Sequence, residues 1–587
     1  MRYHCKLFIL LLLVSTGAAT ARAFGAAVIP VQASHGMVAS VHGLASRAGV
    51  QVMKAGGNAV DAAVAVGFAL AVVNPRAGNL GGGGFMLIRM ADGKKRFIDY
   101  REKAPAAATA NMYQDTQGNV IKGASTVGYK AIGVPGSVAG MVYAEKKYGK
   151  LTLEQVMAPA IKLAQDGFAL TASDAKELRD DKHLAEFPES RRIFLRDGNY
   201  YTAGEIFRQP ELARTLQRIV SNPEDFYHGE MARALAASVQ KGGGLITVDD
   251  LANYEVKERE AVRGSYRGYE IISAPPPSSG GIALIEILNI LEGYHLANSR
   301  ERPAPAIHLT LEAFRRAFFD RAEFLGDPDF SKIPVAQLID KRYATAWRES
   351  IDPDHANVSK DLRRPAIFTQ LEQYAALHPQ PGALPEPDQT THYSVVDPAG
   401  NAVAVTTTLN NSFGSRVTAE GLGFLLNDEM DDFSSKPGTP NVFGLIQGPA
   451  NAIGPGKRPL SAMAPTIVLK DDKLFLVMGS PGGPRIISTV ANIFMGVVDY
   501  GMNIQEAVNA ARFHQQWLPD VAYLEEGFSP DTVKALEGMG YHIEYGVRGE
   551  DTWEPYWSDG ECIMIDLKSG ERLGASDKRH NGRAVGF

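Results

Sequence analysis

Two adjacent threonines, Thr390 and Thr391, lie between a proline-rich segment and an alternating run of residues. Residues 378–389, HPQPGALPEPDQ, predict an extended linker, and THYSVV after them predicts a strand. A threonine hydroxyl is a weak nucleophile until a base removes its proton, and the α-amino group of the same residue can do so only when it is free. Cleavage between Gln389 and Thr390 would create that amine, with a pKa of ~8. The pattern therefore allows a threonine nucleophile whose base is created by cleavage of the chain, although β-propensity alone explains most such threonine pairs.

The segments after Thr390 predict hairpins that would hold this residue on a rigid strand. THYSVV turns through DPAGN into AVAVTTT, and PTIVLK turns through DD into KLFLVMGS. Residues 486–502 and 503–513 then predict helices.

The first part of the chain predicts helices and a further hairpin. Residues 43–75 predict two helices, of which Gly56-Gly57 ends the first and Asn58 caps the second. The second helix is apolar nearly all round and is therefore expected to be buried. Residues 85–101 predict a hairpin. Helices on either side of hairpins predict sheets sandwiched between helical layers.

Two motifs in this part could be mistaken for chemical sites. NLGGGGF, residues 79–85, is followed by no Lys-Ser or Lys-Thr pair and joins a helix to a strand, so it predicts close backbone packing rather than a phosphate loop. Ser278 and Ser279 could be nominated as nucleophiles, but no G-x-S-x-G frame surrounds them. A packing turn is the favoured interpretation. Residues 126–351 are otherwise mostly helical in pattern.

Composition excludes some classes of partner. The chain has 587 residues, a net charge of -6 and scattered basic residues, so no basic surface for nucleic acid is predicted. Its 13 His residues include no H-E-x-x-H motif and no closely spaced ligand pair, so no metal site is predicted.

The amino terminus has the layout of a secretory signal peptide. Basic residues precede an apolar stretch from Leu7 to Val14, and small residues follow up to Ala23. The apolar stretch is too short to span a bilayer comfortably, although an uncleaved anchor is the alternative. Cleavage after Ala23 would leave Cys562 as the only cysteine, so the mature chain would hold no disulfide. We expect export to a periplasm or to the medium.

Nine segments together closely resemble the γ-glutamyltransferase family, also called γ-glutamyltranspeptidase or glutathione hydrolase. They are NLGGGGFMLIRM, DYREKAP, DQTTHYSVVD, TTTLNNSFG, LLNDEMDDFSSKPGTPNVFGLIQG, GPGKRPLSAMAPTIV, GSPGGPRIISTV, NAARFHQQWLPD and GASDKR. The resemblance extends from about Val31 to Phe587. It implies an α+β fold, the four-layer αββα sandwich of the N-terminal nucleophile hydrolases. It also implies a precursor that cuts itself before Thr390, giving a large subunit of residues 24–389 and a small subunit of residues 390–587.

The resemblance also implies roles for individual residues. For catalysis these are Thr390 as nucleophile and base, Thr408 as the residue that orients it, and Gly482 and Gly483 as backbone donors to the oxyanion. For the substrate they are Arg101 and Ser461 at its α-carboxylate, and Asn410, Glu429 and Asp432 at its α-ammonium. Seen alone, Arg101 is a hairpin-end charge and the acids of NDEMDD are a solvated loop.

Three positions depart from the family pattern. Ala462 stands where many relatives have a second serine, so one donor to the substrate carboxylate is missing. Phe443, in a loop that resembles the lid of some members, replaces a tyrosine. Residues 556–565, YWSDGECIMI, are less like the family, and no role is assigned to them.

The implied reaction passes through a γ-glutamyl ester of Thr390. Glutathione or a related compound would supply the γ-glutamyl group, and water, an amino acid or a dipeptide would accept it, without metal or organic cofactor. One alternative is a cephalosporin acylase on the same scaffold, which acts on glutaryl side chains that lack the α-ammonium. The other is a secreted binding protein that has lost catalysis.

Overall fold

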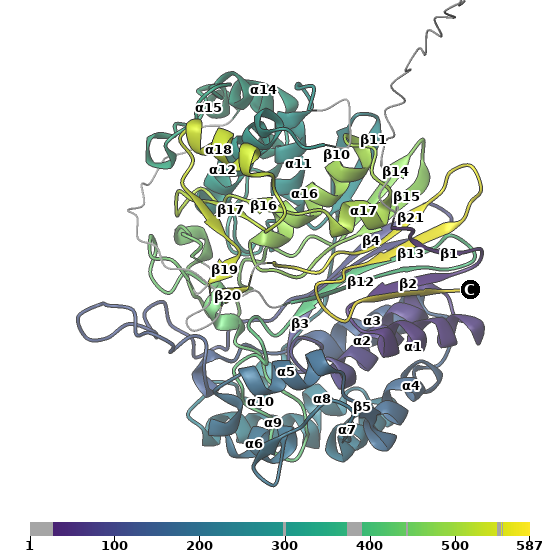
Figure 1. The fold of residues 1–587 in the computed structure, drawn as a ribbon. Coiled ribbons are helices and arrows are strands. Elements are labelled where there is room, and N and C mark those ends of the chain that lie inside the picture. The colour runs from purple at the N-terminus through teal and green to yellow at the C-terminus, as the bar shows by residue number, and fades with distance from the viewer. Residues whose placement is uncertain (1–27, 297–300, 372–389, 442–443, 549–552, 555) are drawn as a thin grey trace, which may run out of the picture.

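The computed structural model describes residues 28–296, 301–371, 390–441, 444–548, 553–554 and 556–587. The predicted signal peptide, Gln389 and Phe443 lie outside these ranges. Two seven-stranded sheets pack face to face, with helices on both outer sides (Figure 1). The predicted four-layer αββα sandwich is therefore confirmed.

All strand pairs within the two large sheets are antiparallel. Sheet 1 has the order β1 (Val31–Ala33), β22 (Arg572–Ser576), β21 (Glu561–Ile565), β15 (Lys473–Met478), β14 (Thr466–Lys470), β11 (Tyr269–Ser273) and β10 (Val262–Tyr266). Sheet 2 has the order β23 (Arg583–Gly586), β2 (Met37–Ser40), β12 (Thr391–Val396), β13 (Ala402–Thr408), β3 (Gly83–Arg89), β4 (Lys95–Tyr100) and β9 (Lys257–Arg259). Each sheet thus mixes strands from before and after Thr390.

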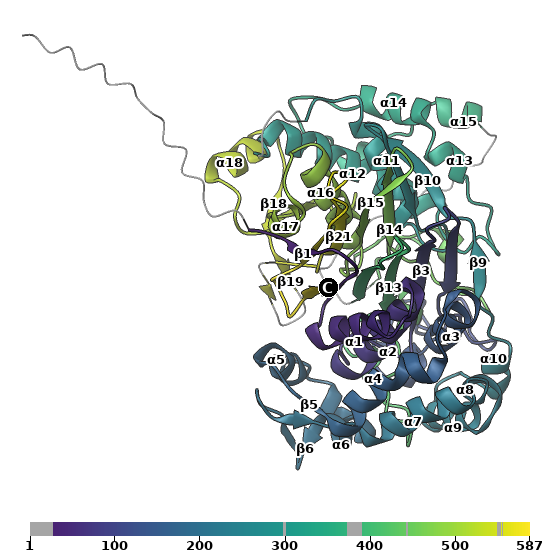
Figure 2. The same ribbon diagram turned by 90° about the vertical axis from the view of Figure 1, so that its right-hand side faces the viewer.

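Helices cover the outer face of each sheet (Figure 2). Over sheet 2 lie α1 (Gly43–Lys54), α2 (Ala59–Val73) and α3 (Ser137–Tyr148); over sheet 1 lie α11 (Gly280–Leu291), α16 (Arg485–Val498) and α17 (Ile504–Asn509). None of the helices in the described ranges is long and apolar enough to cross a membrane.

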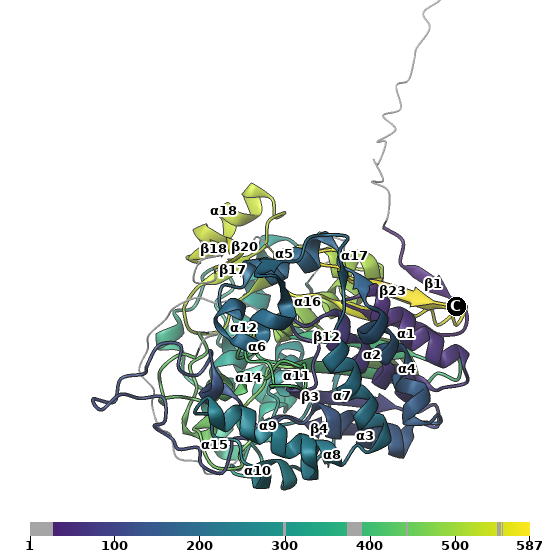
Figure 3. The ribbon, with the colours of Figure 1, turned by 90° about the horizontal axis from the view of Figure 1, so that it is seen from below.

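The remaining elements lie outside the two large sheets. The helices are α4 (Leu153–Asp166), α5 (Ala172–Asp180), α6 (Pro188–Phe194), α7 (Pro210–Ser221), α8 (Asp225–His228), α9 (Glu230–Lys241), α10 (Val248–Ala252), α12 (Ala304–Phe324), α13 (Val335–Leu338), α14 (Lys341–Glu349), α15 (Ile367–Leu371) and α18 (Pro530–Gly538). The view from below shows α7 and α9 on the side of α1 and α2 (Figure 3). Short strands pair outside the large sheets: β5 (Phe168–Ala169) with β8 (Ile206–Phe207), β6 (Leu195–Arg196) with β7 (Asn199–Tyr200), β16 (Phe513–His514) and β18 (Ile543–Tyr545) with β17 (Ala522–Leu524), and β19 (Val547–Arg548) with β20 (Trp553–Glu554).

Alternation along the strands of sheet 2 divides the apolar core into two parts. Phe85 and Leu87 of β3 face sheet 1, whereas Met86 and Ile88 face the helices α1 and α2. All four side chains are buried. Because successive side chains of a strand point to opposite faces, β3 contributes to both cores.

The helix and hairpin predictions near the amino terminus are confirmed. Asn58 caps α2 through a capping box with Asp61, and every residue of α2 is buried. The two predicted hairpins after Thr390 form β12–β13 and β14–β15.

The glycine run serves close backbone packing, as predicted. A Cβ atom at Gly82 would lie 2.0 Å from the carbonyl oxygen of Thr408, and one at Gly84 would lie 2.5 Å from that of Thr406. Real Cβ contacts do not reach these distances, so larger residues would push β3 away from β13. The run therefore holds β13, which carries Thr408, in its place.

Candidate active site

Thr390 lies directly before β12, beside the end of β13. The register of this hairpin pairs Thr391 with Thr407, so Thr390 and Thr408 meet at its open end. Their Oγ1 atoms lie 3.3 Å apart, and Thr408 Oγ1 also accepts a hydrogen bond of 2.8 Å from the backbone N–H of Asn410. The DPAGN turn therefore sets the distance between the two hydroxyls.

Thr390 lines a cavity at the open end of this hairpin. The lining includes nine residues singled out from the sequence, which are Arg101, Thr390, Thr408, Asn410, Glu429, Asp432, Ser461, Ala462 and Gly483. Arg101 comes from the part of the chain before Thr390 and the other eight lie at or after position 390. A single cavity thus draws on both predicted subunits.

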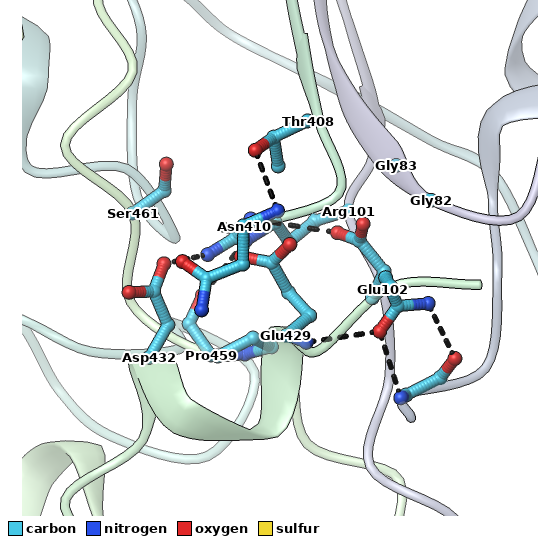
Figure 4. A network of polar contacts seen from close by, with 12 residues as sticks. Gly82, Gly83, Arg101, Glu102, Thr408, Asn410, Glu429, Asp432, Pro459 and Ser461 are labelled. Carbon is cyan, nitrogen blue, oxygen red and sulfur yellow. Dashed lines mark hydrogen bonds and ion pairs between the residues drawn. The ribbon is translucent and has the colours of Figure 1, made fainter. Parts of the chain in front are cut away.

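Arg101, which follows β4, is fully buried and forms ion pairs on several sides (Figure 4). Its Nη1 lies 2.5 Å from Glu429 Oε1 and donates to Glu102 Oε2 at 3.4 Å, and its Nη2 donates to Asp432. Burial opposes the charge of Arg101, but the three carboxylates outweigh it and raise the pKa of the guanidinium above its usual value. Arg101 does follow the last strand of the predicted hairpin, but its charge is buried and ion-paired.

Three of the four acids of NDEMDD, Asp428, Glu429 and Asp431, are buried, and Asp432 is partly buried, so the interpretation of this segment as a solvated loop is wrong. Glu429, at the start of a short 3-10 helix, is 1% exposed, and its Oε2 atom is buried without a hydrogen-bond partner. Burial raises the pKa of Glu429 well above its ordinary value and that of Glu102 to about 7. Glu102, which the sequence interpretation missed, has a buried Oε1 atom that also lacks a partner. Glu429, which lines the cavity, can therefore accept a further donor.

Asn410 is held in place by a buried acid, Asp428, that sequence reasoning missed. The side-chain amide of Asn410 donates to the backbone oxygen of Asp428 at 3.1 Å, and the N–H of Asn411 donates to the Asp428 carboxylate at 2.9 Å. Asn410 has a φ of 78°, a left-handed conformation that asparagine tolerates better than most residues. Burial raises the pKa of Asp428 to about 7.

Ser461 is positioned by the turn that holds Ser278 and Ser279. The backbone oxygen of Ser461 accepts hydrogen bonds from the N–H of Ser279 at 2.8 Å and from its hydroxyl at 2.7 Å, while the Ser278 hydroxyl donates to Met463 O at 2.6 Å. Both hydroxyls are therefore engaged in packing, and the packing-turn prediction is confirmed. Ala462, beside Ser461, presents a methyl group where a second serine would add a hydroxyl.

Gly482 and Gly483 form the turn before α16. Their φ values are 128° and 48°, which L side chains rarely adopt. Gly483 lines the cavity, and a Cβ at Gly482 would lie 2.0 Å from Ser558 Oγ. Residues 556–565, which had no predicted role, thus pack against this turn through Ser558, and their last five residues form β21 of sheet 1.

Arg321 on α12 also lines the cavity, and no motif in the sequence pointed to it. Its Nε donates to Ser279 Oγ at 3.0 Å. Burial lowers the pKa of Arg321 to about 10, which leaves the side chain charged at neutral pH. Within the described ranges, no group of His, Cys, Asp and Glu residues could hold a metal ion.

The arrangement suits chemistry on an amino-acid derivative. Two hydroxyls, Thr390 and Thr408, lie beside a glycine turn, and the rest of the cavity holds both basic and acidic side chains. An α-ammonium and an α-carboxylate could therefore bind at one end while a carbonyl group lies at Thr390.

Comparisons with known proteins show the family to which the chain belongs. A sequence model of the γ-glutamyltranspeptidase family matches residues 45–587. The chain is 53% identical over 518 residues to a glutathione hydrolase proenzyme from Pseudomonas sp. (strain A14), and the match covers 87% of each chain.

Solved structures match as well. A cephalosporin acylase from Bacillus halodurans has a TM-score of 0.82 at 28% identity and covers 97% of this chain and 98% of its own. A γ-glutamyltranspeptidase from Helicobacter pylori has a TM-score of 0.56 at 43% identity and covers 60% of this chain and 99% of its own. The αββα fold is of the N-terminal nucleophile hydrolase type, and the chain belongs to the γ-glutamyltranspeptidase family.

Proposed function

We propose that this protein cleaves the γ-glutamyl amide bond of glutathione and related compounds, with Thr390 as its nucleophile. One observation carries the proposal: the Thr390 hydroxyl lines the same cavity as the cluster of Arg101, Glu429 and Asp432. The 53% identical relative is named a glutathione hydrolase proenzyme, which supports both the substrate and a precursor form.

Maturation would begin with attack of the Thr390 hydroxyl on the peptide bond that joins it to Gln389. Hydrolysis of the resulting ester would release residues 24–389 from residues 390–587 and give Thr390 a free α-amine. The predicted subunits share both large sheets, because β12 pairs with β2 and β13 pairs with β3. They would therefore remain together without a disulfide.

In the mature enzyme, the amine of Thr390 would take the proton of its own hydroxyl as the oxygen attacks the γ-carbonyl carbon. Thr408 orients the attacking hydroxyl, and the backbone N–H groups of Gly482 and Gly483 stabilise the oxyanion. The protonated amine then gives its proton to the leaving nitrogen, and the C–N bond breaks. Water or an acceptor amine removes the γ-glutamyl group from Thr390 in the reverse sequence of proton transfers.

The γ-glutamyl head group would bind through its two charges. Glu429, Asp432 and Asn410 accept from the α-ammonium, and the buried Glu429 Oε2 atom has capacity for a donor. Arg101 and Ser461 bind the α-carboxylate. The ammonium would then take over part of the ion pairing that Arg101 provides in the absence of substrate.

An acylase that acts on glutaryl groups is the second candidate, favoured by the fold similarity to a cephalosporin acylase. A glutaryl group carries no α-ammonium, so it would leave the Glu429 and Asp432 carboxylates without their second cation. Retention of both acids favours γ-glutamyl substrates. We further propose that the protein is exported, from the signal-peptide pattern of residues 1–23.

Intact-mass measurement combined with a γ-glutamyl anilide assay tests the proposal. The purified protein should give two chains that divide at Thr390 and should release the anilide product. Thr390→Ala should stay uncut and inactive, whereas Thr391→Val, a matched change at the adjacent residue, should still be cut. Normal cleavage of Thr390→Ala would refute the nucleophile, and a cut wild-type protein that processes only glutaryl anilides would favour the acylase.

A further inference from the structure

Arg321 is a buried cation in the catalytic cavity that no carboxylate neutralises by contact. Its side chain is 2% exposed, and its Nη1 atom is buried without a hydrogen-bond partner. Within the described residues, the one hydrogen bond of its side chain runs from Nε to Ser279 Oγ. No carboxylate lies within ion-pair distance of it, and Asp432 is the acid whose charge acts on it from further away. An unpaired buried charge is costly, so an anionic group that enters the cavity would be strongly attracted to it.

The other arginine of the cavity is in the opposite situation. Arg101 contacts the carboxylates of Glu102, Glu429 and Asp432, and its Nε donates to Pro459 O at 3.2 Å. One guanidinium therefore faces three acids. The charge of Arg101 is thus balanced by acids in direct contact, whereas Arg321 has no acid in contact and is favoured only by the more distant charge of Asp432.

Arg321 also lies at a defined end of the cavity. Its Nε donates to Ser279 Oγ, and Ser279 Oγ in turn donates to the backbone oxygen of Ser461 at 2.7 Å. Ser461 and Ala462 line the cavity at this point. The side chain of Arg321 is thus linked through Ser279 to Ser461 in the lining of the cavity.

We propose that Arg321 is a second residue that binds the α-carboxylate of the γ-glutamyl group, with Nη1 as its donor. This inference rests on the proposed function and adds to it the cation that receives the substrate anion. The α-ammonium enters the cluster of acids around Arg101, while the α-carboxylate bridges from Arg101 to Arg321. A planar guanidinium suits this contact, because it can present two parallel N–H groups to a carboxylate.

The assignment gives a physical reason why Ala462 is tolerated. A serine at this position would add one neutral donor to the carboxylate. Arg321 already supplies a charged donor from the same wall, and hydrogen bonds to charged groups are the stronger kind. Loss of the second serine hydroxyl would then weaken substrate binding without abolishing it.

Two ligands that differ only in the α-carboxylate isolate this contact. L-Glutamate and 4-aminobutyrate share the amine and the γ-carboxylate, so the ratio of their dissociation constants measures recognition of the α-carboxylate. Calorimetric titration of the purified protein should show that wild type favours glutamate. Arg321→Gln should lower that preference by roughly ten- to a hundredfold, as expected for the loss of a charge-assisted hydrogen bond.

Ser279→Ala is the matched control, because it removes the link to Ser461 and keeps the charge of Arg321. It should leave the preference for glutamate within about threefold of wild type, a difference smaller than one hydrogen bond. If Arg321→Gln weakens both ligands equally, or if Ser279→Ala reproduces its effect, Arg321 only supports Ser461 and the proposal is overturned. A wild-type protein without preference for glutamate overturns it too.

Two further measurements distinguish a loss of carboxylate binding from misfolding and from a failure of the proposed function. If Arg321→Gln does not fold, Arg321→Lys decides, because an ammonium keeps the charge but cannot present two parallel N–H groups to a carboxylate. A reduced preference for glutamate then supports the proposal, and an unchanged one overturns it. Hydrolysis of the γ-glutamyl anilide by wild type is measured independently, so loss of the proposed function leaves the binding comparison interpretable.

Discussion

Removal of the Thr408 hydroxyl is the most direct test of the catalytic geometry. Thr408→Val keeps the β-branched shape that suits the end of β13 and replaces only the hydroxyl by a methyl group. That oxygen lies 3.3 Å from Thr390 Oγ1 and accepts the backbone N–H of Asn410 at 2.8 Å. The substitution therefore removes one partner of the nucleophile and leaves one buried donor without an acceptor.

The structure sets the size of the effect. The contact between the two hydroxyls is longer than the usual 2.7–2.8 Å, so its own contribution lies at the lower end of about 0.5–1.5 kcal/mol. The unsatisfied N–H of Asn410 adds about 1–3 kcal/mol if it stays buried. If the variant stabilises the transition state by about 1–3 kcal/mol less than wild type, its kcat/KM should fall by about 5- to 150-fold.

Thr406→Val provides a matched control on the same face of β13. The Thr406 hydroxyl pairs with His392 Nδ1 at 2.9 Å and contacts neither Thr390 nor Asn410. Both variants should be followed by the rate at which the chain is cut and by the kcat/KM for a γ-glutamyl anilide. If Thr408→Val matched wild type in both, or if Thr406→Val lost as much activity, the orienting role of Thr408 would be refuted.

Two other substitutions test the cavity. Ala462→Ser adds a donor beside Ser461 and should lower the KM for γ-glutamyl anilides by about twofold to a hundredfold, measured against glutaryl anilides; an unchanged or higher γ-glutamyl KM would contradict the lost-donor interpretation. Glu102→Gln tests pH dependence. Burial raises the pKa of Glu102 from 4.5 to about 7, so the folded state holds its proton more tightly than the unfolded state and stability falls as pH rises between these values, by up to about 3 kcal/mol. The variant should flatten this part of the profile of Tm against pH, and an unaltered slope would assign the titration to another group.

Local patterns were sufficient to predict the elements that position the nucleophile. The capped helix α2 and the hairpin β12–β13 each depend on neighbours close in the sequence, whereas the partners of Ser278 and Ser279 lie more than 180 positions away and only their turn was predicted. Their physical causes are capping, period-two alternation and turn chemistry, which are visible in a short window of sequence. The glycine run belongs to the same class, because its helix-to-strand context excluded a phosphate loop.

The electrostatics of the cavity could not be predicted in the same way. Asp432 is separated from Arg101 by 331 positions, so the burial of the NDEMDD acids depends on a partner that no local pattern reveals. Family resemblance brought these residues together as a set but did not indicate that they neutralise one another. Arg321 and Asp428 were missed because each has the sequence context of an ordinary polar residue, in a helix and in an acidic loop.

The topology also explains how one chain can become two without losing its site. Hairpin β12–β13, which follows Thr390, is inserted between β2 and β3, which precede it, and β1 pairs with β22 near the end of the chain. Cleavage before Thr390 would break none of these ladders, because β12 begins at the next residue. The cut would change only the chemistry at its own position, where an amide nitrogen becomes an amine. A fold that is complete before cleavage can therefore generate its catalytic base in a pocket that is already assembled.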